Sequence, residues 1–338
     1  MNAAAAPTFL LPALGLGVAV MFVASLLVGP AAIAPLEILG SFLGGATVDS
    51  RGDIETLIVL EVRLPRALLG LMIGATLGLA GAALQGFLRN PLVEPGLIGV
   101  SSAAALGSVL AFYSGLAALF ALALPLGGMA GACLGVLVVQ SLAGRDGSPL
   151  TLILAGVAVT SFAGALTSLA LNLAPNPFAA LEVMFWLMGS LADRSFDHVW
   201  LSAPFMIAGW LMLITLGQPL DALTLGEDTA QTLGFDLRAV RRRLVLGTAL
   251  SVGAATSVAG AVGFVGLIVP HLLRPLTGHR PSTLLPASAL GGAILTLTAD
   301  LVVRLLADGP ELKLGVLTAL VGAPFFLFLV LRLRRKLL

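Results

Sequence analysis

The sequence predicts an all-α membrane protein that crosses the bilayer about ten times. Hydrophobic residues make up 58% of the 338 residues and charged residues 10%, whereas a soluble domain carries roughly 25% charged residues. Apolar runs of the length that spans a bilayer follow one another along the chain. The 40 glycines favour close packing of helices inside a membrane.

The apolar runs place the predicted helices in order. They cover residues 8–28, 64–86, 97–114, 117–142, 150–173, 199–217, 239–259, 261–273, 283–306 and 314–332. The first run is predicted to be a retained helix, because no basic residue precedes it as in a signal peptide. The run 261–273 is short, so it is either a half-helix or the continuation of a bent helix with 239–259. No soluble domain fits between the runs, and residues 1–338 are predicted to form a single transmembrane domain.

The basic residues predict the orientation. Ten crossings place both termini on one side, and the loops of that side hold twelve Lys and Arg residues against six on the other. Because positive loops stay inside, both termini are predicted to be cytoplasmic. The single cysteine, Cys133, is predicted to be a small core residue.

Two polar connections are predicted to contain short helices. In 174–198, the stretch Leu181–Leu187 is expected at the outer membrane interface. In 218–243, Glu227 and Asp228 favour a helix start near Gly226, and Gly234 is a plausible stop. The apolar side of this helix would hold Leu225, Ala230 and Leu233. The helix either lies on lipid or docks into a partner protein.

The sequence contains no phosphate-binding loop and no zinc-protease, CxxC or nucleophile-elbow motif. We therefore expect no catalytic residue, metal or cofactor in this chain. Asp300 is the acid placed well inside an apolar run, and Arg304 follows at i+4. Asp300 is either part of an ion relay or, as we favour, a locally paired structural acid. Such a scarcity of buried charge argues that a separate protein supplies the energy.

A turn with two prolines separates the runs 64–86 and 97–114. It reads Arg89-Asn90-Pro91-Leu92-Val93-Glu94-Pro95-Gly96. Because each proline stiffens the chain, the turn is either a rigid plug of a gate or an ordinary connector.

Several blocks resemble the FecCD-type permease family of ABC importers, which take up iron-siderophores, heme and cobalamin. They include Arg63-Leu-Pro-Arg66, Gly81 to Gly86, Arg89 to Leu92 with Glu94 to Ser102, Leu225 to Glu227 with Leu233-Gly234, Gly263 to His271, Leu285 to Ala287, Ala299-Asp300, Glu311-Leu312 with Gly315, and Gly322 to Phe325. The resemblance runs from Arg63 to the C-terminus, and the blocks occur in order at fitting distances.

The resemblance implies the type II importer fold, with ten helices in each chain of a homodimer in the bacterial inner membrane. Two ATPase subunits, which hold ATP and Mg, would bind on the cytoplasmic side, and a periplasmic binding protein would deliver the cargo from the other side. No nucleic-acid partner is expected. The segment 226–234 would be the coupling helix seated on the ATPase, through Gly226, Glu227, Asp228, Leu233 and Gly234. Asn90 and Leu92, with Pro149 and Leu150, would form the cytoplasmic gate, and Arg63, Arg66 and Arg304 would dock the binding protein.

The expected cargo follows from one short run. Pro95 to Ser102 resembles heme permeases slightly more than siderophore permeases, while cobalamin permeases share its glycine. We therefore expect heme, with ferric siderophores and cobalamin as alternatives. An ion-coupled secondary transporter and an intramembrane enzyme are the competing hypotheses. Both need clustered polar groups inside the membrane, which the sequence lacks.

Overall fold

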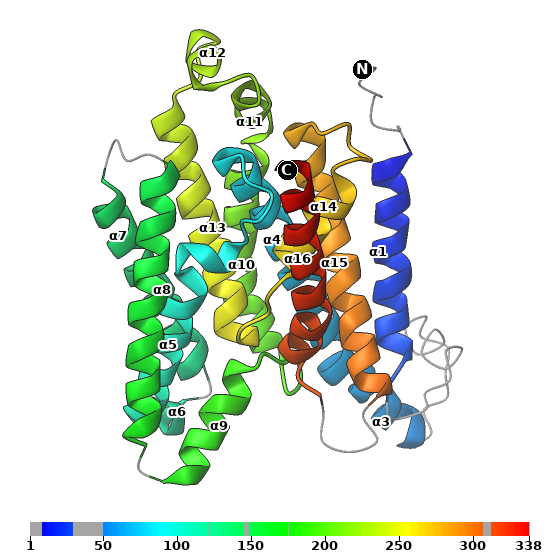
Figure 1. Cartoon of the computed structure of the whole chain (residues 1–338). Helices are drawn as coiled ribbons and strands as arrows, with labels where there is room; N and C mark the ends of the chain where they lie inside the picture. Colours follow the sequence, from blue (N-terminus) through cyan, green and yellow to red (C-terminus); the bar gives the residue numbers. More distant parts are fainter. Residues whose placement is uncertain are drawn as a thin grey trace.

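The computed structural model of the chain is a bundle of long helices (Figure 1). It describes residues 9–29, 50–120, 122–144, 149–174, 176–306 and 312–337, and every regular element in these ranges is a helix. The ten predicted runs correspond to α1 (Leu10–Leu27), α4 (Leu64–Leu88), α5 (Val100–Tyr113), α7 (Ala123–Ala143), α8 (Pro149–Asn172), α10 (Phe196–Ile214), α13 (Leu237–Ala259), α14 (Val265–Leu273), α15 (Pro281–Leu305) and α16 (Leu314–Leu337).

Among the described residues, 7 helices are long and apolar enough to cross a membrane. Helices α5 and α14 have 14 and 9 residues, which is short for a full crossing. Helix α13 is long enough, but its first two turns contain Arg238, Arg241, Arg242 and Arg243. The prediction of a polytopic all-α protein is therefore confirmed, and the count of ten is approximate.

Shorter helices connect the long ones. They are α3 (Ser50–Leu57), the π-helix η1 (Ile58–Arg63), the 3-10 helix η2 (Pro95–Ile98), α6 (Leu116–Leu119), α9 (Pro177–Leu187), α11 (Gly217–Leu223) and α12 (Glu227–Thr232). Helix α9 contains the predicted stretch Leu181–Leu187. It begins earlier because Asn176 caps it, accepting a hydrogen bond from the amide of Ala179 at 2.9 Å.

Helix α4 is the central helix of the bundle, and glycines let its neighbours approach it closely. A Cβ at Gly74 would collide with the backbone carbonyl of Gly292, and one at Gly78 with that of Ser288, both on α15. On the same helix, Gly81 meets the backbone of Gly266 on α14. The close packing that these small residues allow thus stabilises the helix contacts, since no hydrophobic effect drives helices together in lipid.

A π turn precedes α4. The amide of Leu64 donates to the carbonyl of Val59, five residues earlier. Pro65 follows directly and has no amide to donate, and in a regular α-helix its ring would clash with the carbonyl of residue 61. The wider π turn removes this conflict and lets α3, η1 and α4 continue as one rod.

Helices α13 and α14 are separate, so the bent-helix alternative for 239–273 is wrong. Helix α13 ends at Ala259, before Gly260 with φ of 73°, and α14 begins after Phe264, with φ of 66°. The left-handed conformation is uncommon for a bulky residue such as Phe264. Helix α14 is therefore a half-helix that starts inside the bundle.

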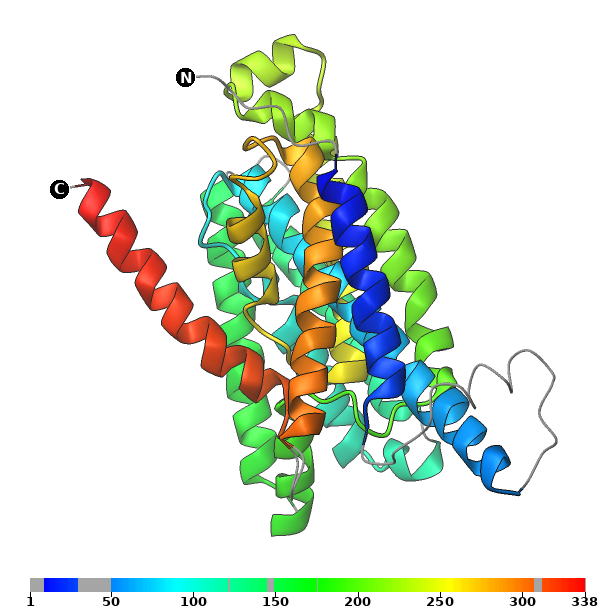
Figure 2. The ribbon, with the colours of Figure 1, turned by 90° about the vertical axis from the view of Figure 1, so that its right-hand side faces the viewer.

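The start of α1 and the end of α16 lie at the same end of the bundle as α12 (Figure 1), as predicted for the termini. Figure 2 shows that α16 diverges from the other helices toward its C-terminal end. The molecule thus has an α12 end and an opposite end.

The prediction for Cys133 is wrong, because its side chain is exposed on α7. The frequent burial of cysteine reflects its apolar character in water-soluble proteins. On a membrane helix, an apolar side chain has no such reason to face inward, because lipid tails are as apolar as the protein interior.

Candidate functional site

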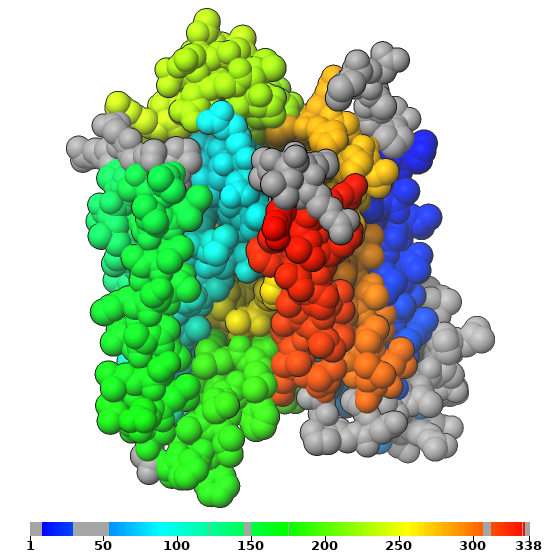
Figure 3. Space-filling model, in the orientation of Figure 1, coloured from blue at the N-terminus to red at the C-terminus, as the bar shows by residue number. Residues whose placement is uncertain are grey.

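The predicted partner-docking segment forms a short helix at one end of the molecule. Helix α12 begins after Gly226, whose φ of 111° favours glycine, and it ends before Gly234, whose φ is 89°. Glu227 and Asp228 occupy its first turn, where carboxylates interact favourably with the helix dipole. In the space-filling view this segment is the protrusion at the top (Figure 3).

The apolar residues of this segment point in two directions. Ala230 is fully buried and packs toward the bundle, whereas Leu225 and Leu233 are 68% and 59% exposed. Two exposed leucines flanking a polar helix form a small apolar surface. Such a surface fits either lipid or the hollow of a partner protein.

The predicted gate residues fall into two places. Asn90 and Leu92 lie in one tight turn, because the Asn90 Oδ1 atom accepts the amide of Leu92 at 3.0 Å. Leu150 is exposed at the start of α8, and the side chain of Pro149 lies outside the described residues. The turn follows Arg89, which ends α4 in the left-handed conformation with φ of 51°.

A buried amide, which the sequence analysis missed, ties this turn to the rest of the protein. The Gln85 Nε2 atom donates to the carbonyls of Val93 and Gly266, at 3.1 and 3.2 Å. Its Oε1 atom accepts the Nη2 group of Arg274 at 2.6 Å, and burial lowers the pKa of that guanidinium. Gln85 thereby joins α4, the 90–98 segment and α14.

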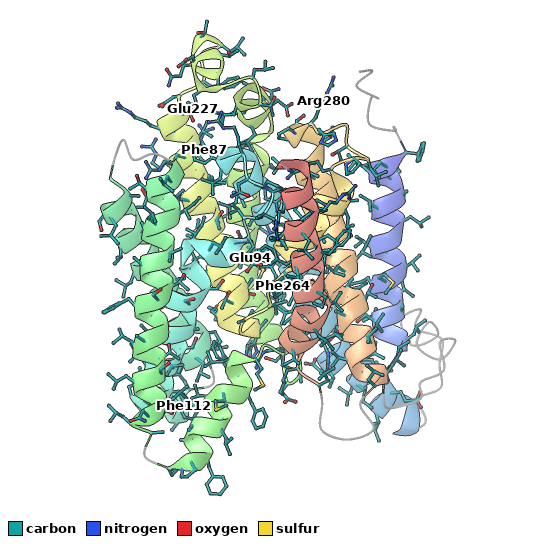
Figure 4. All side chains as sticks on the ribbon, viewed as in Figure 1. Phe87, Glu94, Phe112, Glu227, Phe264 and Arg280 are labelled. Atoms are coloured by element: carbon teal, nitrogen blue, oxygen red, sulfur yellow. The ribbon has the colours of Figure 1, made fainter. Side chains whose placement is uncertain are left out.

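Glu94 was also missed as a residue inside the bundle. Its Oε2 atom accepts the amide of Phe264 at 3.1 Å, and the two residues lie side by side at mid-height in Figure 4. The Phe264 side chain does not cap α14, so Glu94 satisfies one of the free amides at the start of this half-helix. A carboxylate there also suits the helix dipole.

Two of the three predicted docking arginines, Arg66 and Arg304, meet around Asp300 at the opposite end. The Arg66 Nε atom lies 3.0 Å from Oδ1 of Asp300, and the Arg304 Nε atom lies 2.8 Å from Oδ2. Asp300 itself is 1% exposed. This arrangement matches the interpretation of Asp300 as a locally paired acid, with a second arginine from α4.

Arg63, the third predicted docking arginine, closes the end of α1 together with Arg304. The Nη1 group of Arg63 donates to the carbonyls of Leu26 and Leu27 at 2.9 and 2.8 Å. The Nη1 group of Arg304 donates to the carbonyl of Ser25 at 2.8 Å. These carbonyls belong to the last turn of a helix, where no intrahelical donor reaches them. Arg63 and Arg304 therefore attach α1 to the bundle.

A cavity of about 670 Å³ opens beside α16. It is lined by the end of α9, by the segment between α13 and α14, and by small and apolar residues of α16 such as Gly315, Ala319 and Ala323. In Figure 3 this face is hollowed between α8 and α16. An apolar recess of this size suits a bulky cargo better than a bare ion.

Comparisons with known proteins agree along the length of the chain. The model of the FecCD transport family matches residues 17–332. The chain is 41% identical over 293 residues to the vitamin B12 import system permease protein BtuC of Salmonella typhi, covering 86% of this chain and 88% of that protein. It is 38% identical over 296 residues to the ABC transporter permease protein YvrB of Bacillus subtilis, covering 86% and 83%.

A solved structure of a metal-chelate type ABC transporter in an inward-facing conformation matches with a TM-score of 0.80 and 33% identity, covering 95% of this chain and 98% of that chain. The likeness thus extends over sequence, fold and nearly the whole length. It supports the importer permease and gives no support to the secondary transporter or the intramembrane enzyme. The chain belongs to the FecCD transport family and is the membrane-spanning permease of an ABC importer.

Proposed function

We propose that this chain, as one half of a homodimeric permease, carries a corrinoid chelate of the vitamin B12 type from the periplasm into the cytoplasm. The observation that carries the proposal is the 41% identity, over 86% of the chain, to permeases named for vitamin B12 import. ATP is hydrolysed by two separate ATPase subunits, and a periplasmic binding protein delivers the chelate.

Heme, the cargo expected from the sequence, becomes the second candidate. Its support was the run Pro95 to Ser102, and much of that run has a packing role in the fold. Pro95 and Ile98 are buried, and a Cβ on Gly99 would meet the backbone of Gly156 on α8. Residues that fit one helix against another carry little information about a cargo.

The α12 end is the cytoplasmic end in this proposal. The basic start of α13, Arg274, Arg280 and the basic end of α16 gather there, as positive loops do on the inner side. Helix α12, with its exposed Leu225 and Leu233, is then the coupling helix that docks into the ATPase.

The remaining predicted sites are assigned on the same proposal. The turn of Asn90 and Leu92, with the start of α8, contributes to the cytoplasmic gate. Arg63, Arg66 and Arg304 are assigned to docking of the binding protein at the proposed periplasmic end, where Arg63 is buried and the Arg304 side chain is 5% exposed. Their contacts with Asp300 and α1 mean that they also hold the fold, so docking adds to an existing structural role.

Uptake into proteoliposomes tests the proposal. The permease is reconstituted with its cognate ATPase and binding protein, and labelled vitamin B12, heme and a ferric siderophore are offered in turn. ATP-dependent accumulation of vitamin B12 that requires the binding protein is the expected result.

Two other outcomes are informative. Uptake of heme or of the siderophore, without vitamin B12, keeps the importer and overturns the corrinoid assignment. A matched sample with non-hydrolysable ATP controls for leakage, and uptake that persists in it contradicts ATP-driven transport.

A further inference from the structure

Arg89 combines an unusual backbone with a long-range contact. Its φ of 51° and ψ of 33° are left-handed, a conformation that glycine or asparagine normally supplies at the end of a helix. An arginine at such a position is strained relative to glycine, and strain of this kind points to a role for the side chain.

The side chain of Arg89 reaches the proposed coupling helix. Its Nη2 group lies 2.8 Å from the Oε1 atom of Glu227, the first residue of α12, across a sequence separation of 138 residues. The two side chains are 49% and 46% exposed. An ion pair this exposed contributes little to folding stability, so holding the fold together does not account for the strained arginine.

The backbone that follows Arg89 is tied down in the interior. Val93 is held through its carbonyl by Gln85, and Glu94 is bonded to the amide of Phe264 at 3.1 Å. The segment 90–94, which runs from Arg89 to the contact with the start of α14, is therefore short and fixed at both ends. Because no flexible segment lies between them, a displacement of Arg89 should move Glu94 and the start of α14 as well.

We propose that Arg89 is a positioning residue that links the coupling helix α12 to the gate turn and, through Glu94, to the start of α14. The inference rests on the proposed function of α12. When the ATPase shifts α12, the ion pair draws the 90–98 segment with it. Coupling carried by a contiguous, bonded set of residues is the physical condition for such a relay.

Four variants test the relay. Arg89→Gly removes the side chain and suits the left-handed backbone, so the fold is kept while the link is lost. Arg89→Glu and Glu227→Arg each place like charges together, and the double reversal R89E/E227R restores an opposite pair. Arg242→Glu, on an exposed position of α13, is the matched control for a charge change at the same end.

The measurement is the number of ATP molecules hydrolysed per chelate transported in proteoliposomes. We expect Arg89→Gly and both single reversals to raise this ratio by roughly fivefold or more, the lower range of allosteric coupling. The double reversal and Arg242→Glu should stay near the unaltered protein. An unchanged ratio in Arg89→Gly, or a double reversal no better than its singles, overturns the proposal.

A second readout does not depend on the cargo. A nitroxide is attached at Leu97, through Leu97→Cys in a Cys133→Ala background, and its spectrum is recorded before and after ATP is added to the permease–ATPase complex. The spectrum should change in the unaltered protein and in the double reversal, and not in Arg89→Gly. A spectral change in Arg89→Gly contradicts the relay. This result does not depend on which chelate the permease transports, because no chelate is added.

Discussion

At the scale of single residues, Asp300 balances two guanidinium groups in the interior. Arg66 comes from α4 and Arg304 from one turn further along α15, and both bond to the same carboxylate. Arg304 in turn holds the end of α1. Removal of this one negative charge therefore affects three helices.

Asp300→Asn is expected to destabilise the protein by about 3–5 kcal/mol, the cost of breaking a buried ion pair and leaving its partners uncompensated. Thermal unfolding in detergent measures the change. Asp228→Asn, on the exposed α12, is the control and should leave unfolding unaltered. Equal unfolding temperatures for the two variants would show that the arginines find other partners.

The residues that the sequence analysis missed share a physical reason. Gln85 and Glu94 have partners 181 and 170 residues away in the chain, and no local pattern signals such bonds. Glu94 lies in a connector that contains two prolines, and such a connector is normally expected at the surface, so its position inside the bundle was not predicted. The arginines were predicted as surface groups, and their second role emerged only when α1 was in place.

At the scale of elements, the contact between α4 and α15 depends on the absence of side chains. Gly78 lies against the carbonyl of Ser288 so closely that a methyl group has no room. The two helices touch through their backbones at this point, as in other glycine-rich membrane interfaces.

Gly78→Ala should therefore force the helices apart and cost about 1–3 kcal/mol, as overpacking of a core does. Gly164→Ala is the matched control, because nothing lies within 4 Å of a Cβ on Gly164 of α8. Urea or heat unfolding of both variants in the same detergent compares them. A loss in Gly164→Ala as large as in Gly78→Ala would indicate that the close approach is not the cause.

Helix α12, the proposed coupling helix, offers an element-scale test of a different kind. Leu233→Asp places a charge on the exposed apolar surface of α12 without disturbing a buried contact. We expect the unfolding temperature to be unaltered and the affinity for the ATPase to fall by roughly tenfold or more, as for a central interface residue. Surface plasmon resonance on permease in nanodiscs measures the affinity, and unaltered binding would favour the lipid-facing interpretation of α12.

The elements themselves were largely predictable from the sequence. Apolar length located each long helix, and Gly226 and Gly234 located the short α12 to within two residues. The break between α13 and α14 was left open because Phe264 carries no intrinsic preference for a left-handed backbone. Its conformation is imposed by packing, including the contact of its ring with Gly322 on α16.

At the scale of the whole molecule, charged groups gather at two ends. The α12 end carries the basic start of α13 together with the acids of α12. At the opposite end, Arg66 and Arg304 bond to Asp300, and Arg63 donates to the end of α1. If this end faces the periplasm, as we propose, the three arginines would attract an acidic partner over distances set by the ionic strength.

Binding of the periplasmic protein to permease in nanodiscs should therefore weaken as salt is raised, chiefly through slower association. Association rates at two salt concentrations measure this effect. The unaltered unfolding temperature over the same range serves as the control, since the buried contacts of these arginines are little screened. Rates that do not change with salt would contradict docking through the arginine cluster.

The π turn before α4 fixes the rotation of α3 relative to α4. An α-helix turns by about 100° for each residue, so one residue more or fewer between α3 and α4 would swing α3 around the shared axis by that angle. Ile54 and Leu57, which are both exposed, would then point in a direction about 100° away from their present one. The π turn at Ile58–Arg63 thus sets the rotation of α3 about the helix axis, and with it the direction in which the apolar side chains of α3 point.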